Sequence, residues 1–155
     1  MRGAALNRLI GGLMKEVTAR LYVSPEPKGR PRFTSFGGHI HTYTPKKTEL
    51  YERRIKEQYI KYTDGYKFEK GQPICVYVVF GMPIPASSPK SRKRAMAEGI
   101  IRHTKKPDVD NMVKSVLDAL NGVAWVDDSQ IVRLTAMKQY CEEPYVYIKI
   151  YESVD

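Results

Sequence analysis

Four aspartates lie at the two ends of one short amphipathic segment, and oxygen ligands of this kind bind hard divalent cations. Asp108 and Asp110 lie at the start of the segment, and Asp127 and Asp128 follow its end. Carboxylates that come close together repel one another, so such a cluster either takes up protons or binds a cation. Because neither histidine nor cysteine is among the four, we expect them to bind Mg²⁺, with Mn²⁺ as a possible substitute.

The segment between the two aspartate pairs is predicted to be a helix. Pro107 disfavours helical backbone in the residue before it, which makes Asp108 a natural N-cap, and Asn121 with Gly122 suits the end. The buried stripe is predicted to be Met112, Val113, Val116, Leu117 and Leu120. We expect residues 123–126 to form a short strand that returns the chain to the start of the helix. The two aspartate pairs would then meet.

The same residues also allow structural explanations. Acids in the first turn of a helix interact favourably with its dipole, which would account for the first aspartate pair but not for the second. Lys114 lies one turn beyond Asp110 and one turn before Asp118. It would therefore either contact a scissile phosphate or form an ion pair within the helix. The sequence leaves both roles of Lys114 open.

The composition favours a polyanionic partner. The chain has 155 residues with 26 Lys and Arg against 17 Asp and Glu, a net charge of +9, which suits nucleic acid or an anionic membrane face. The length fits one domain. The longest apolar run, residues 74–82, is about half as long as a membrane-spanning helix and is typical of a buried strand. We therefore expect a cytoplasmic protein without a membrane partner.

Two basic segments are candidate DNA contacts. Residues 24–45 are rich in Pro and Gly, which predicts a loop or ribbon, and Phe33 and Phe36 there would either stack on bases or pack under the loop. Residues 88–106 begin with Ser88 as a predicted N-cap and Pro89 as the first helical residue, and would otherwise be a solvated helix face or a linker. The predicted DNA-binding residues are Lys28, Arg30, Arg32, Lys90, Arg92, Lys93, Arg94, Lys105 and Lys106.

The order of predicted elements defines an α+β fold. Strands are expected over 17–23, 74–82, 131–140 and 145–151. A further helix is expected to begin with the hydroxyl of Thr44 as its cap and Pro45 as its first residue. This order predicts one domain over residues 17–155, a small mixed sheet packed with helices, with residues 1–16 as a peripheral arm. A basic surface around an acidic metal site suits phosphodiester hydrolysis, because the cation neutralises growing charge and activates water.

The stretch KPDVDNMVKSVLDALNGVAWVDDSQIV resembles the signature of the RusA family of Holliday junction resolvases. The upstream segments PKGRPRF and YTP are also similar to the family, so that the resemblance extends from about Val17 to Tyr151. It implies a RusA-like fold and a bacterial or phage-encoded homodimer. The implied activity is that of a Mg²⁺-dependent endonuclease that makes paired symmetric nicks in four-way junction DNA, in recombination and repair.

The resemblance also implies roles for individual residues. The catalytic carboxylates of the family correspond to Asp108, Asp110 and Asp128, with Asp127 as a further acid in the same pocket, and the essential lysine corresponds to Lys114. The extra N-terminal residues and the longer basic insert over 88–99 depart from the shortest members, so the family's preferred cleavage sequence is not carried over. Two alternatives stay open: a nuclease for other branched DNA, and a DNA-binding protein without catalysis.

Overall fold

The computed structural model describes residues 15–154. Its elements are β1 (Glu16–Leu21), β2 (Arg32–Phe36), β3 (His39–Tyr43), α1 (Lys46–Thr63), β4 (Ile74–Pro83), α2 (Lys90–Ala97), α3 (Val109–Leu120), the 3₁₀ helix η1 (Asp128–Gln130), β5 (Ile131–Cys141) and β6 (Tyr145–Glu152). Most of the arm that we predicted at residues 1–16 lies outside the described residues. Among residues 15–154, none of the helices has the length and apolar character needed to span a bilayer.

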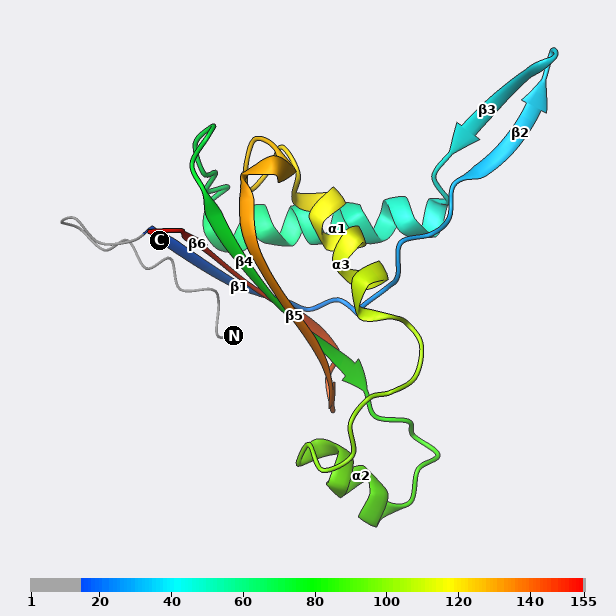
Figure 1. Ribbon diagram of the computed structural model, residues 1–155. Helices are drawn as coiled ribbons and strands as arrows, with labels where there is room; N and C mark the ends of the chain where they lie inside the picture. Colours follow the sequence, from blue (N-terminus) through cyan, green and yellow to red (C-terminus); the bar gives the residue numbers. More distant parts are fainter. Residues whose placement is uncertain (1–14, 155) are drawn as a thin grey trace.

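The main sheet has the strand order β1-β6-β4-β5. β6 is antiparallel to both β1 and β4, whereas β4 and β5 are parallel, so the predicted mixed sheet and α+β class are confirmed. Parallel neighbours require a long crossover connection, and here that connection contains α2, α3 and η1. Every aspartate of the candidate site therefore lies on the crossover between two adjacent strands (Figure 1).

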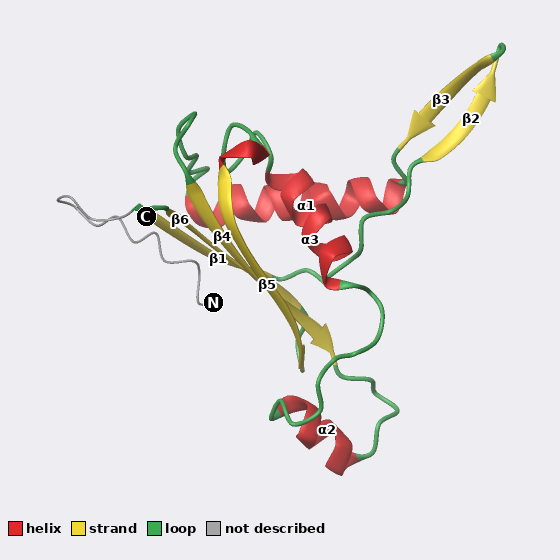
Figure 2. Ribbon diagram, viewed as in Figure 1, coloured by secondary structure: helices red, strands yellow, loops and turns green. Residues whose placement is uncertain are grey.

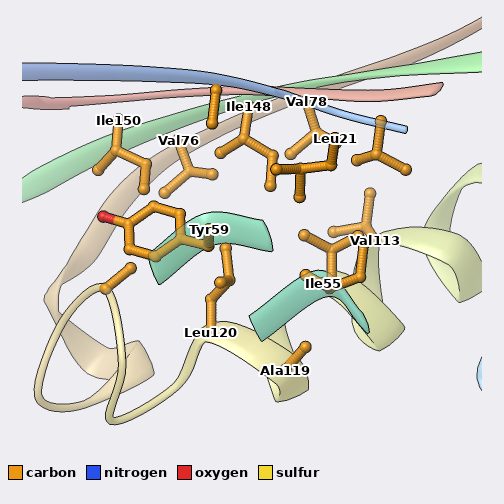
Figure 3. Close-up of a cluster of buried hydrophobic side chains, with 14 of the residues drawn as sticks. Leu21, Ile55, Tyr59, Val76, Val78, Val113, Ala119, Leu120, Ile148 and Ile150 are labelled. Carbon is orange, nitrogen blue, oxygen red and sulfur yellow. The ribbon is translucent and has the colours of Figure 1, made fainter. Parts of the chain in front are cut away.

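The core lies between one face of the sheet and the helices α1 and α3 (Figure 3). Val76 and Val78 of β4 are paired with Ile150 and Ile148 of β6, and alternation places all four toward the helices. Helix α3 buries the stripe predicted from sequence, although Leu117 is only partly buried. Because this stripe is fixed in the core, Asp110 and Lys114 on the opposite face are exposed.

Two of the predicted helix starts are wrong by one position. Pro45 is the N-cap of α1 and Pro89 is the N-cap of α2, and neither helix has a side-chain capping hydrogen bond. The cause is the backbone of these prolines, which has helical φ of −58° but extended ψ of 139° and 152°. The hydroxyls of Thr44 and Ser88 are therefore not the caps that we expected.

Two parts of the chain project away from the sheet and its helices (Figure 2). The hairpin of β2 and β3 forms a separate two-stranded sheet. Helix α2 contributes Met96 as its buried residue and otherwise displays basic side chains. These two projections belong to the basic segments, residues 24–45 and 88–106, that were predicted to contact DNA.

Candidate active site

Asp108 and Asp110 lie at the N-terminus of α3, which confirms the predicted start of that helix. Asp108 is the N-cap, with extended backbone at φ −76° and ψ 144°, but its side chain makes no capping hydrogen bond. Its Oδ2 instead accepts a hydrogen bond of 2.9 Å from Nζ of Lys106, and both side chains are more than half exposed. The carboxylate of Asp108 is therefore directed toward solvent and the ammonium of Lys106 rather than toward the backbone N–H groups of the helix.

Lys138 of β5 holds the loop that leads to Asp108. Its Nζ donates hydrogen bonds to the carbonyl oxygens of Lys105, at 2.6 Å, and of Pro107, at 2.8 Å. Lys138 was not among the residues predicted from sequence. The alternation of β5 was the available signal, because it places Lys138 between Ala136 and Tyr140 on the side of the sheet that faces the helices.

His103 lies in the same loop, and its ring packs 4.8 Å from the ring of Tyr140. Burial lowers the pKa of His103, and the nearby positive charge of Lys138 lowers it further. The neutral form of the imidazole is therefore favoured beside the loop. Together, Lys138 and His103 fix a stretch of backbone that has no regular secondary structure.

Lys114 is exposed one turn beyond Asp110. Asp118, its other neighbour on this face, lies 2.8 Å from the ammonium of Lys28 instead. Among residues 15–154, Lys114 forms no ion pair. The structure thus gives no support to the intrahelical ion pair, and the ammonium of Lys114 is available to a ligand.

Asp127 has a structural role at the start of η1. Its Oδ1 accepts a hydrogen bond of 2.8 Å from the backbone N–H of Ser129, and Gln130 completes a capping box by accepting from the N–H of Asp127. The hydrogen bonds from Ser129 hold the pKa of Asp127 below its usual value. One of its carboxylate oxygens is therefore committed to the turn.

Asp128 is oriented by a buried aromatic residue. Its Oδ1 accepts a hydrogen bond of 2.7 Å from Nε1 of Trp125, whose side chain is fully buried. An isolated β-bridge joins Trp125 to Asn121, the C-cap of α3. Asp128 is therefore held near the C-terminal end of α3.

The two aspartate pairs do not meet within one chain, and our expectation that they would is wrong. Residues 123–126 form a turn with a single bridge rather than a strand, so the chain stays near the end of α3 (Figure 1). A helix of 12 residues is about 18 Å long, and this length separates Asp108 and Asp110 from Asp128. Within residues 15–154, no group of three or more His, Cys, Asp or Glu could hold a metal ion. A single chain does not supply a three-carboxylate magnesium site.

Lys28 has carboxylate partners that favour a structural role over the DNA contact that we expected. Its ammonium lies between Glu52 of α1 and Asp118 of α3, and its side chain is only 18% exposed. Its backbone N–H donates to the carbonyl of Asn111 at 3.1 Å. A phosphate would have to compete with these two carboxylates for the Lys28 ammonium.

The other predicted DNA-binding residues lie at the surface. Arg30 and Arg32 are exposed at the base of the β2–β3 hairpin. On α2, Arg94 pairs with Glu98 at 2.8 Å. Exposed or half-buried side chains that remain candidates on and after α2 are those of Lys90, Arg92, Lys93, Arg94, Lys105 and Lys106. The hairpin leads into α1, and the α2 segment leads into the N-terminus of α3.

The fold and the exposed acids at both ends of α3 suit a nuclease, and comparison with known proteins identifies its class. Residues 23–151 match the family described as Endodeoxyribonuclease RusA. The chain therefore belongs to the RusA family of endodeoxyribonucleases, which confirms the resemblance seen in the sequence.

Two relatives place the chain more closely. It is 36% identical over 132 residues to the uncharacterized protein YqaN of Bacillus subtilis (strain 168), covering 85% of this chain and 93% of that protein. It is 33% identical over 113 residues to the crossover junction endodeoxyribonuclease rusA of Lactococcus phage r1t, covering 68% of this chain and 79% of that protein.

Proposed function

We propose that this endodeoxyribonuclease resolves four-way DNA junctions as a Mg²⁺-dependent homodimer, nicking two opposing strands symmetrically in recombination and repair. The family match and the name of the phage relative support a junction substrate. The observation that carries the proposal is the placement of carboxylates at both ends of α3, exposed at Asp108 and half-buried at Asp128, each held by a defined hydrogen bond. Within one chain these carboxylates remain in two separate groups, Asp108 and Asp110 at the start of α3 and Asp128 near its end.

A two-fold dimer would unite the divided set. When two copies of a segment lie antiparallel about a two-fold axis, the beginning of one segment faces the end of the other. Asp108 and Asp110 of one protomer would then face Asp128 of the partner subunit, and symmetry would generate a second identical site. Two sites related by a two-fold axis suit a junction, which has the same approximate symmetry and needs one nick in each of two strands.

The surface next to Asp128 favours such an association. β5 is an edge strand of the sheet, and its side chains Val132 and Leu134 are 60% and 44% exposed. Val126, two residues before Asp128, is also exposed. A long edge strand with exposed apolar side chains is a ready surface for pairing with another chain. Covering this surface with a second copy would also bring new groups to Asp128.

Each residue then has a defined role. Asp108, Asp110 and Asp128 would hold the cation, and Asp127 would contribute the oxygen that its capping hydrogen bond leaves available. When bound, Mg²⁺ would neutralise charge on the phosphate and lower the pKa of the attacking water. Lys114 would donate a hydrogen bond to a non-bridging phosphate oxygen, and the exposed arginines and lysines of the two basic segments would hold the DNA backbone.

Mapping the nicks tests the substrate. A synthetic four-way junction, a flap and a linear duplex would each be incubated with the protein and Mg²⁺. We expect paired nicks in the four-way junction alone. Nicks at the flap would favour a broader nuclease for branched DNA, and the absence of nicks with intact binding would favour a DNA-binding protein without catalysis.

A catalytic variant separates binding from chemistry. Asp110→Asn should abolish nicking but keep junction affinity, or increase it, because a negative charge near the DNA is removed. Asp64→Asn is the matched control, since Asp64 is exposed at the C-cap of α1 and asparagine tolerates its left-handed backbone. Equal loss of binding and nicking in Asp110→Asn would contradict a role at the metal site.

Mixed dimers test whether the site is shared. Asp110→Asn and Asp128→Asn are each expected to be inactive alone. In a dimer of one subunit of each kind, a shared arrangement puts both substitutions in one site and leaves the other site intact. Mixing should therefore restore nicking of one strand per junction. If each site came from a single chain, both sites of the mixed dimer would be defective and no activity would return.

A further inference from the structure

The β2–β3 hairpin exposes large apolar side chains that pack on nothing in the described chain. All residues of both strands are exposed, and Phe33, Phe36 and Ile40 are 71%, 83% and 76% exposed. The hairpin extends beyond the end of α1, away from the main sheet (Figure 1). An isolated two-stranded ribbon is at best marginally stable in water. Keeping such side chains in solvent indicates a binding surface.

The register divides the hairpin into two different faces. Arg32 is opposite Tyr43 and Phe36 is opposite His39, and alternation puts these four side chains on one face. We call this set the recognition face. Phe33, opposite Thr42, lies on the other face. The recognition face therefore combines aromatic rings with a cation, whereas the other face carries no charged side chain.

The surroundings of the recognition face are basic. Residues 27–48 contain five Lys and Arg and no Asp or Glu. A pocket at the base of the hairpin is lined by Arg30, Arg32 and Lys47, with Glu26 and neighbouring prolines. Lys47 forms an ion pair of 2.9 Å with Glu26, but neither Arg30 nor Arg32 forms an ion pair within residues 15–154. The two arginines are free to hold a phosphate.

We propose that the recognition face binds a DNA strand at the branch point. Phe36 would stack on a base of this strand, and Arg32 together with the neighbouring Arg30 would hold the phosphates of the strand. This inference rests on the proposed function and adds a source of substrate selectivity. In linear duplex the faces of the bases are covered by their neighbours, whereas a base at a branch point can leave the stack. Aromatic side chains stack on exposed bases of any sequence, and insertion of an apolar side chain unstacks a base step.

Phe33 provides a matched control for Phe36. Both are exposed phenylalanines of the same strand, but they lie on opposite faces of the hairpin. The test uses Asp110→Asn protein, which leaves the DNA uncut, with 2-aminopurine at the branch point of a four-way junction. This base analogue fluoresces more strongly when it leaves the stack. Adding Phe36→Ala or Phe33→Ala then asks which face of the hairpin meets the DNA.

Phe36→Ala should remove most of the fluorescence increase and weaken junction binding at least about five-fold, while Phe33→Ala changes binding by less than about two-fold. Neither substitution should change the melting temperature, because both rings are exposed. Equal effects of the two substitutions, or no effect of either, would overturn the proposal. So would a change of oligomeric state in Phe36→Ala without DNA, since the hairpin would then bind a second copy of the chain.

The proposed function has a separate readout, which is nicking of the junction by the wild-type protein with Mg²⁺. Wild-type nicking combined with normal junction binding by Phe36→Ala would refute the hairpin proposal and leave the proposed function intact. A wild-type protein that neither nicks nor prefers the junction would instead refute the proposed function. The two failures are therefore distinguishable in one set of reagents.

Discussion

Replacing Lys28 with methionine tests whether this residue ties the start of the hairpin segment to the helices. Its ammonium is bound by Glu52 of α1 and Asp118 of α3, and the two carboxylates are 21% and 33% exposed. A hydrogen bond to a charged group contributes about 1.5–3 kcal/mol when buried. Water screens partly exposed carboxylates. We therefore expect Lys28→Met to lower the free energy of unfolding by about 2 kcal/mol in total.

Urea and thermal denaturation followed by circular dichroism would measure this loss. In a domain of this size, about 2 kcal/mol corresponds to a melting temperature lower by roughly 4–8 °C. Lys47→Met is the control, because Lys47 also pairs with a glutamate but is 78% exposed. Such a surface pair contributes about 0–1 kcal/mol. The difference between the two variants measures the combined effect of the second carboxylate partner and the partial burial of Lys28.

The pH dependence gives a second check on Lys28. Burial alone lowers the pKa of this lysine, but hydrogen bonds to Asp118 and Glu52 outweigh it, and the net shift is upward from 10.5. Folding therefore favours the ammonium form, whose contribution is fully present below the unfolded pKa and is lost as pH rises through the folded pKa. The gap between wild type and Lys28→Met should stay constant near neutral pH and shrink above 10.5.

One result would refute this account of Lys28. If Lys28→Met unfolded like Lys47→Met but bound DNA more weakly, with a flatter salt dependence, the residue would be a phosphate contact after all. Its pairing with the two carboxylates would then have no measurable effect on folding, and the DNA-binding assignment made from sequence would return.

Three further substitutions address the site and the hairpin. Trp125→Phe removes the donor to Asp128 and should slow nicking without weakening junction binding, and denaturation should show a loss of about 2 kcal/mol. Lys138→Met should lower kcat without raising KM because the loop before Asp108 loosens, and Lys149→Met, on the far face of the sheet, should not. Arg32→Ala should make the slope of log affinity against log salt less steep by about one.

The sequence was sufficient to predict helix α3. Its N-cap position at Asp108, most of its apolar stripe and its end at Asn121 and Gly122 follow from local backbone preferences and from a 3.6-residue period, and these features are confirmed. The burial of Val146, Ile148 and Ile150 likewise follows from the two-residue period of the strand that was expected over residues 145–151. These features depend on neighbours in sequence, so that local rules are enough.

Other features depend on contacts that local rules do not contain. Residues 123–126 were expected to be a strand because they are apolar, but Ala124 and Trp125 are buried in a turn against the core. Lys28 looks like any basic loop residue until α1 and α3 bring Glu52 and Asp118 to it.

The hairpin was only partly foreseen, because a ribbon was one of two options for residues 24–45. The dipeptide Gly37-Gly38, with φ of +61° and +80°, was the unused signal. Two successive residues with positive φ form the turn that joins antiparallel strands with the correct twist. The exposure of Phe33 and Phe36 also removes the option that both rings pack under the loop.

The hydrogen bond between Trp125 and Asp128 gives the protein an intrinsic optical probe. Trp125 is the single tryptophan of the chain, and its indole N–H lies 2.7 Å from the carboxylate oxygen. Indole emission responds to charge and hydrogen bonding at that nitrogen, so arrival of a cation at Asp128 would alter the emission spectrum. Titrating the unlabelled protein with Mg²⁺ at increasing protein concentration would then report metal affinity and subunit association in one cuvette.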